Sequence, residues 1–128
     1  MLRRRPISTR PLAALAVAAA LLHTGCADDA ALTRVRDARV TVTLDDFSIA
    51  PQRLRAAPGR IELDVRNRGA IGHTLRVLRG DREVAGVKTL LPGASGTASG
   101  TLERGDYDLV CILGNHEVLG MYGTLTVR

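Results

Sequence analysis

The chain has 128 residues, with 18 basic and 13 acidic side chains, a formal net charge of +5 and three aromatic residues. Four of the basic residues and none of the acidic ones precede Cys26, so the remainder carries a net charge of +1. Such a remainder offers neither the positive charge nor the stacking surfaces of a nucleic-acid-binding protein. Its length fits one domain and an export segment.

The first 25 residues predict a secretory signal peptide. Met1–Arg10 carries four arginines, Pro11–Leu22 is apolar and uncharged, and Thr24–Gly25 supplies the small residues expected at a cleavage site. The apolar run is shorter than the roughly 20 residues that a membrane-spanning helix requires. A buried Ala/Leu helix is the alternative interpretation.

The segment Leu22-His23-Thr24-Gly25-Cys26 resembles the lipobox of bacterial lipoproteins, although His23 stands where leucine is expected. The resemblance implies that Cys26 receives a diacylglycerol and anchors the protein to the outer side of the cytoplasmic membrane. Cleavage by ordinary signal peptidase, which would leave a periplasmic protein, is the alternative. We expect residues 26–37 to form the lipidated N-terminus and a tether, and residues 38–128 to form the domain. Cys111 is then the one thiol left, so an intramolecular disulfide is excluded.

After residue 38 the sequence changes to short runs of alternating polarity, separated by turn residues. No helical period persists there, and this spacing predicts an all-β, antiparallel Greek-key sandwich or barrel of seven or eight strands. The better strand candidates are Arg39–Leu44, Arg60–Val65, His73–Leu78, Tyr107–Ile112 and Gly123–Val127, and the weaker ones are Gln52–Ala56, Val87–Leu90 and Gly96–Leu102.

Four scarce side chains point to chemistry. Cys111, His116 and Met121 fall in one stretch near the C-terminus, and His73 opens an expected strand. Two imidazoles, one thiolate and a distant thioether are the ligands of a blue-copper electron-transfer site, a set that both Cu(I) and Cu(II) accept. Each residue alone would more often be a core or hydrogen-bonded side chain, so the prediction rests on their combination.

The spacing Cys111-x4-His116-x4-Met121, followed by a final strand, resembles the C-terminal loop of the cupredoxins, the small blue copper proteins. The upstream Asn67-x-Gly69-x3-His73 is similar to the turn that carries the first ligand of that family, and Asp46-Phe47-Ser48 resembles its opening strands. The resemblance covers Arg39 to Arg128. It implies one copper ion held by His73, Cys111, His116 and Met121, with the carbonyl of Gly72 as a further weak axial ligand.

Two positions depart from the family pattern. Gly114-Asn115 stands where the family often has Pro-Gly, and both pairs suit a turn. Thr74 follows the first histidine, where the family often has Asn or Asp. The sequence therefore leaves open how the two ligand loops are tied together by hydrogen bonds.

The resemblance implies a monomeric one-electron carrier that exchanges electrons through the edge of His116. Ile71, Leu113, Val118 and Leu119 are expected to form an apolar docking patch for transient redox partner proteins. Copper buffering or delivery through the same residues is the alternative function, although the Met/His-rich tracts of many trafficking sites are missing from the sequence. A metal-free sandwich is a third interpretation. An enzyme is not expected, because one closed site leaves no obvious substrate position.

Overall fold

Strands whose side chains are alternately buried and exposed dominate the part of the chain that the computed structural model describes, residues 31–128. The alternation follows from the two-residue period of an extended backbone, which turns successive side chains to opposite faces of a sheet. In chain order the strands are β1 (Leu32–Arg34), β2 (Arg39–Asp45), β3 (Ser48–Ala50), β4 (Arg53–Ala56), β5 (Gly59–Asn67), β6 (His73–Arg79), β7 (Arg82–Leu90), β8 (Ser95–Leu102), β9 (Gly105–Val110) and β10 (Tyr122–Val127).

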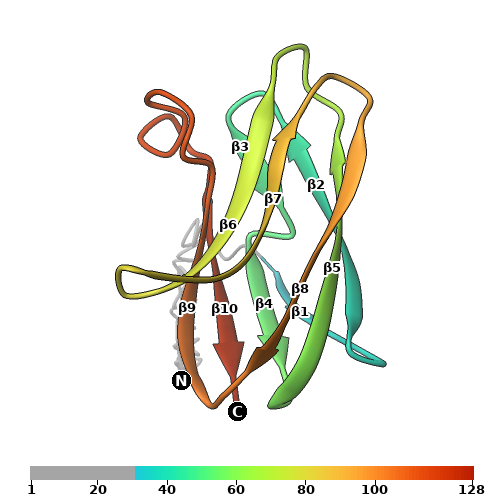
Figure 1. Cartoon of the computed structure of the whole chain (residues 1–128), viewed down its shortest axis with the longest axis vertical. Helices are drawn as coiled ribbons and strands as arrows, with labels where there is room; N and C mark the ends of the chain where they lie inside the picture. Colours follow the sequence, from blue (N-terminus) through green and yellow to red (C-terminus); the bar gives the residue numbers. More distant parts are fainter. Residues whose placement is uncertain (1–30) are drawn as a thin grey trace, which may run out of the picture.

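The strands form two sheets, and the expected all-β sandwich is confirmed (Figure 1). One sheet has the order β1-β4-β10-β9-β6-β7 and the other the order β3-β2-β5-β8. Three neighbouring pairs are parallel rather than antiparallel, namely β1 with β4, β10 with β4, and β2 with β5. These parallel partners are separated in the chain by long connections or by strands of the opposite sheet. Tight turns do not join them, so their direction is not constrained to be antiparallel.

All eight predicted strands are present, and the structure adds β1 and β3. Both additions have three residues, which is too short for an alternating pattern to be recognised. β1 lies in the segment that the sequence places in the tether, and it pairs with β4 along Leu32–Arg34. The sheet therefore begins before residue 38, because β4 offers an edge that even a short strand can pair with. The expected signal peptide and Cys26 lie outside the described residues.

A core of aliphatic side chains fills the space between the two sheets. Leu44, Leu63, Leu75, Leu109 and Leu125 are fully buried, each a contribution of about 1.5–3 kcal/mol from the hydrophobic effect. The same cluster includes Cys111 and Met121, so two of the predicted ligands rest directly on the packed core. Within residues 31–128, no helix has the length and apolar character needed to cross a membrane.

The loop between β9 and β10 lies at the end of the molecule opposite the C-terminus, as Figure 1 shows. Because β6 and β9 are antiparallel neighbours, with Arg76 opposite Val110, the start of β6 lies beside the end of β9. The sheet thus brings His73, the first residue of β6, next to the segment that begins at Cys111.

Candidate metal centre

The β9–β10 loop is held in a compact shape by its own backbone. The amide of Cys111 donates to the carbonyl of Met121 over 3.1 Å, and the amide of Met121 donates to the carbonyl of His116 over 3.0 Å. A further turn is closed by the amide of His116, which donates to the carbonyl of Leu113 over 3.1 Å. The loop returns on itself, and the three predicted ligands that it carries are linked through main-chain hydrogen bonds.

The structure brings His73, Cys111 and His116 together. One ligand atom from each lies within 4.8 Å of the others. Nδ1 of His73 is 3.3 Å from Nδ1 of His116, and that nitrogen is 3.6 Å from Sγ of Cys111. His73 and Cys111 are buried and His116 is half-buried. The three donor atoms therefore face one common point beneath the surface.

These separations fit a single ion of the first transition row. Donors at about 2.0–2.3 Å from one metal and about 110–120° apart would lie about 3.3–3.8 Å from each other. The separations of 3.3 Å and 3.6 Å fall in that range. Because the donor set is two imidazoles and one thiol, it suits copper in both oxidation states.

Met121 and Gly72 occupy different settings near this cluster. Met121 is fully buried, and its backbone is hydrogen-bonded to both Cys111 and His116. Gly72 is half-buried directly before His73, where an added Cβ would come within 3.3 Å of a methyl group of Thr89. Coordination by the sulfur of Met121 and by the carbonyl of Gly72 stays a prediction.

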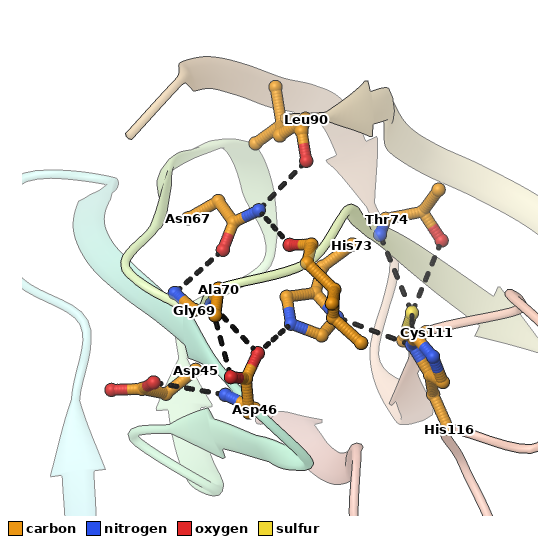
Figure 2. A network of polar contacts seen from close by, with 11 residues as sticks. Asp45, Asp46, Asn67, Gly69, Ala70, His73, Thr74, Leu90, Cys111 and His116 are labelled. Atoms are coloured by element: carbon orange, nitrogen blue, oxygen red, sulfur yellow. Dashed lines mark hydrogen bonds and ion pairs between the residues drawn. The ribbon is translucent and has the colours of Figure 1, made fainter. Parts of the chain in front are cut away.

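Thr74 ties the two ligand segments together, which the sequence left open. Its amide lies 3.4 Å from Sγ of Cys111 and its hydroxyl 3.8 Å from the same sulfur (Figure 2). The hydroxyl also accepts a hydrogen bond from the amide of Ile112 over 3.2 Å. Since an amide and a hydroxyl both point at the sulfur, Thr74 stabilises negative charge on it.

Asp46 is a site residue that sequence reasoning missed. Its Oδ1 lies 3.1 Å from Nε2 of His73, and both of its carboxylate oxygens accept from the amide of Ala70 over 3.0 Å. Two hydrogen bonds lower the pKa of Asp46 below its ordinary value: the one from the Ala70 amide has the larger effect, and the one with the ring of His73 has the smaller. The sequence carried one signal, because histidine ligands usually donate their second ring nitrogen to a carboxylate or carbonyl. That rule does not select one acid from the 13 in the chain.

Phe47 contacts the second imidazole. Its ring centroid is 5.4 Å from that of His116, and the two planes meet at 83°, an edge-to-face arrangement. Phe47 comes from the turn between β2 and β3, as Asp46 does. One short turn early in the chain therefore contacts both histidines.

Asn67 shapes the turn that precedes His73. Its buried side-chain amide donates to the carbonyls of Ile71 and Leu90, each over 2.8 Å, and its Oδ1 accepts from the amide of Gly69 over 2.9 Å (Figure 2). These bonds hold the chain from β5 to β6 in one conformation. The position of His73 follows from that conformation.

Exposed apolar side chains lie on the two segments that carry the predicted ligands. Of the predicted docking residues, Ile71, Val118 and Leu119 are exposed, and Val118 is 87% exposed. Leu113 is half-buried and packs against the core, so it offers less surface than the other three. Within residues 31–128, five further large hydrophobic side chains that the sequence did not select are exposed, namely Leu32, Phe47, Leu91, Ile112 and Tyr122.

Solved structures resemble this fold closely, although no protein-family model and no curated protein sequence matches the chain. Reduced auracyanin from the photosynthetic bacterium Roseiflexus castenholzii is 18% identical, with a TM-score of 0.69 over 73% of this chain and 99% of that one. An azurin from Methylomonas sp. strain J is 14% identical, with a TM-score of 0.65 over 73% of this chain and 99% of that one.

A multicopper oxidase is also similar. It is 20% identical, with a TM-score of 0.58 over 70% of this chain and 41% of that one. Auracyanin and azurin are cupredoxins, so these likenesses confirm the expected cupredoxin fold. At such low identity these likenesses establish the fold alone, and the chemistry has to be inferred from the residues of the site.

Proposed function

We propose that this protein, a cupredoxin by fold, binds one copper ion and carries single electrons. The observation that carries the proposal is the convergence of one thiol and two imidazoles within 4.8 Å, at one end of the sandwich. A bound copper would supply a one-electron couple between Cu(I) and Cu(II). His73, Cys111 and His116 are the ligands we propose, with Met121 as the weak axial ligand and the Gly72 carbonyl as a second axial contact.

The surroundings of the ligands suit a carrier because they restrict movement. The core beneath Cys111 is closely packed, the loop is braced by main-chain hydrogen bonds, and Thr74 points two donors at the sulfur. Ligands held in this way change position little when the charge at their centre changes. A small change in geometry lowers the reorganisation that electron transfer requires.

We propose that electrons pass through the half-buried ring of His116, and that a redox partner docks on the exposed Ile71, Val118 and Leu119 around it, with Leu113 at the margin. An apolar patch of this kind supports brief contacts, typically below about 1,200 Å². The described residues contain one cluster that could hold a metal, formed by His73, Cys111 and His116, and we propose a carrier rather than an enzyme. We also propose that the protein acts as a monomer.

Export and anchoring remain proposals that rest on the sequence. The arginine-rich start, the apolar run and Cys26 support a lipid-anchored protein on the outer side of the cytoplasmic membrane. Radiolabelled fatty acid should enter the wild-type protein and not Cys26→Ser. If neither the wild type nor Cys26→Ser is labelled, and the protein is released in soluble form, the result would indicate a free periplasmic protein.

The copper proposal is tested by optical and EPR spectra after Cu(II) is added to the purified chain. We expect an intense absorption in the red region from thiolate-to-copper charge transfer, which Cys111→Ser abolishes. Met121→Leu is the matched variant, because it should keep the colour and shift the reduction potential. A copper-loaded, oxidised protein without that absorption would contradict the proposal. Rapid transfer of copper to an acceptor, together with slow electron self-exchange, would instead favour copper delivery.

A further inference from the structure

The two ring nitrogens of His73 face different surroundings. Nδ1 points to the common centre, 3.3 Å from Nδ1 of His116, and Nε2 lies 3.1 Å from Oδ1 of Asp46 (Figure 2). The ring itself is 0% exposed. An ionised carboxylate can only accept a hydrogen bond, so this contact favours the tautomer of His73 that carries its proton on Nε2 and turns the lone pair of Nδ1 to the centre.

Neighbouring residues hold the side chain of Asp46 in place. Its amide donates to Oδ1 of Asp45 over 2.9 Å, while its own oxygens accept from the amide of Ala70. Gly69 is required beside it, because an added Cβ would lie 2.3 Å from Oδ1 of Asp46 and 2.7 Å from Nε2 of His73. The carboxylate and the imidazole meet only because residue 69 has no side chain.

We propose that Asp46 is a positioning residue for His73: its carboxylate holds the imidazole with Nδ1 toward the copper centre and favours the Cu(II) state. The proposal rests on the proposed copper function. A carboxylate that accepts from a metal-bound imidazole fixes the orientation of the ring and raises its basicity as a ligand. Its negative charge also stabilises the more positive oxidation state. Asp46 therefore strengthens Cu(II) binding more than Cu(I) binding and lowers the reduction potential.

Three variants separate these effects. Asp46→Asn removes the charge and keeps an acceptor oxygen, while Asp46→Ala removes both. Asp45→Asn is the matched control, because it removes an equal charge one residue away. The side-chain oxygen of this control can still accept from the amide of Asp46, and the Asp46–His73 contact would stay intact.

The experiment measures Cu(II) and Cu(I) affinities by competition, the reduction potential by voltammetry, and the protonated nitrogen of His73 by 15N NMR of the metal-free full chain. Cu(II) affinity should fall about 10–100-fold in Asp46→Asn. The reduction potential rises by about 59 mV for each factor of ten by which the loss of Cu(II) affinity exceeds the loss of Cu(I) affinity. Asp45→Asn should change the potential far less. His73 should be protonated at Nε2 in the wild type and lose this single form in Asp46→Ala.

Equal potentials in Asp46→Asn and Asp45→Asn would overturn the proposal and leave the copper function intact. His73 protonated at Nδ1 in the metal-free wild type would overturn it as well. A wild-type chain that binds no copper would overturn the proposed function, and with it the claim about Cu(II). The NMR measurement would still decide whether Asp46 orients His73. Far-UV circular dichroism of each variant shows that the comparison is made between folded proteins.

Discussion

The amide and the hydroxyl of Thr74 both point at Sγ of Cys111, over 3.4 Å and 3.8 Å. Thr74 follows one predicted ligand, His73, and the sulfur belongs to another, so this contact joins the two ligand segments across the sheet. The hydroxyl accepts from the amide of Ile112, which leaves its proton free for the sulfur. Threonine therefore provides the link that the family often makes with Asn or Asp.

Replacing Thr74 should change the reduction potential of the copper-loaded protein. Thr74→Val removes the hydroxyl donor, which increases the negative charge on the sulfur and favours Cu(II). The potential should fall by about 40 mV, the equivalent of one net hydrogen bond of about 1 kcal/mol. Voltammetry checks the shift. Thr74→Ser is the control, since it keeps the hydroxyl and should keep the potential. An unchanged potential in Thr74→Val would show that the 3.8 Å contact carries no energy.

Asn67 should be essential to the stability of the turn before His73. Asn67→Ala leaves the carbonyls of Ile71 and Leu90 without their donor, at a cost of about 2–3 kcal/mol in the free energy of unfolding. Asn67→Asp should destabilise further at neutral pH, because its charge would face these two carbonyls. Urea denaturation measures both variants. Equal stability of Asn67→Asp and the wild type would show that the two donated bonds are dispensable.

Gly120 should tolerate substitution less well than Gly114. Both residues have positive φ, at 128° and 50°, but an added Cβ at Gly120 would lie 2.6 Å from the carbonyl oxygen of Phe47, while Gly114 has open space. Gly114→Ala should cost about 1–2 kcal/mol from backbone strain.

Gly120→Ala should lower the free energy of unfolding by more than Gly114→Ala does, because Phe47 must move and its edge-to-face contact with His116 is disturbed. Denaturant midpoints compare the two variants, and the ring shifts of His116 in NMR spectra report the contact. A smaller loss in Gly120→Ala than in Gly114→Ala would contradict the close approach of Phe47.

Asp106 should give the fold a small dependence on acid pH. Hydrogen bonds from the guanidinium of Arg128 and, to a smaller extent, from the hydroxyl of Thr126 lower the pKa of the Asp106 carboxyl. Since the folded pKa lies below the unfolded value of about 3.9, the stabilisation is complete above that value. It is lost as the pH falls through the folded pKa.

An NMR titration of the Asp106 carboxyl carbon should show the lowered pKa in the wild type and a value nearer to the ordinary one in Arg128→Gln. Melting temperatures of the wild type and Asp106→Asn should differ at neutral pH and converge once the pH has fallen below the lowered pKa of Asp106. A difference that persists unchanged in acid would mean that the pair contributes nothing through charge.

The local pattern of the chain was sufficient to predict eight of the ten strands and to name the candidate ligands. Eight strands were predicted, because alternation of polarity is a property of adjacent residues and reflects a buried and an exposed face. Cys111, His116 and Met121 were predicted as ligands for a similar reason, since they share one short loop whose spacing resembles that of the cupredoxins. His73 stood out as a scarce residue at the start of a strand.

Contacts between residues far apart in the chain were decided by the tertiary structure alone. The parallel pairing of β4 with β1 and β10 depends on which edges meet when the sheets close, and no local pattern encodes it. Asp46 reaches His73 across 27 positions, and Phe47 reaches His116 only because the β2–β3 turn packs against the β9–β10 loop. Composition and spacing name the side chains that can bind a metal. The surroundings that orient them arise when distant segments pack together, because hydrogen bonds and packing act through space.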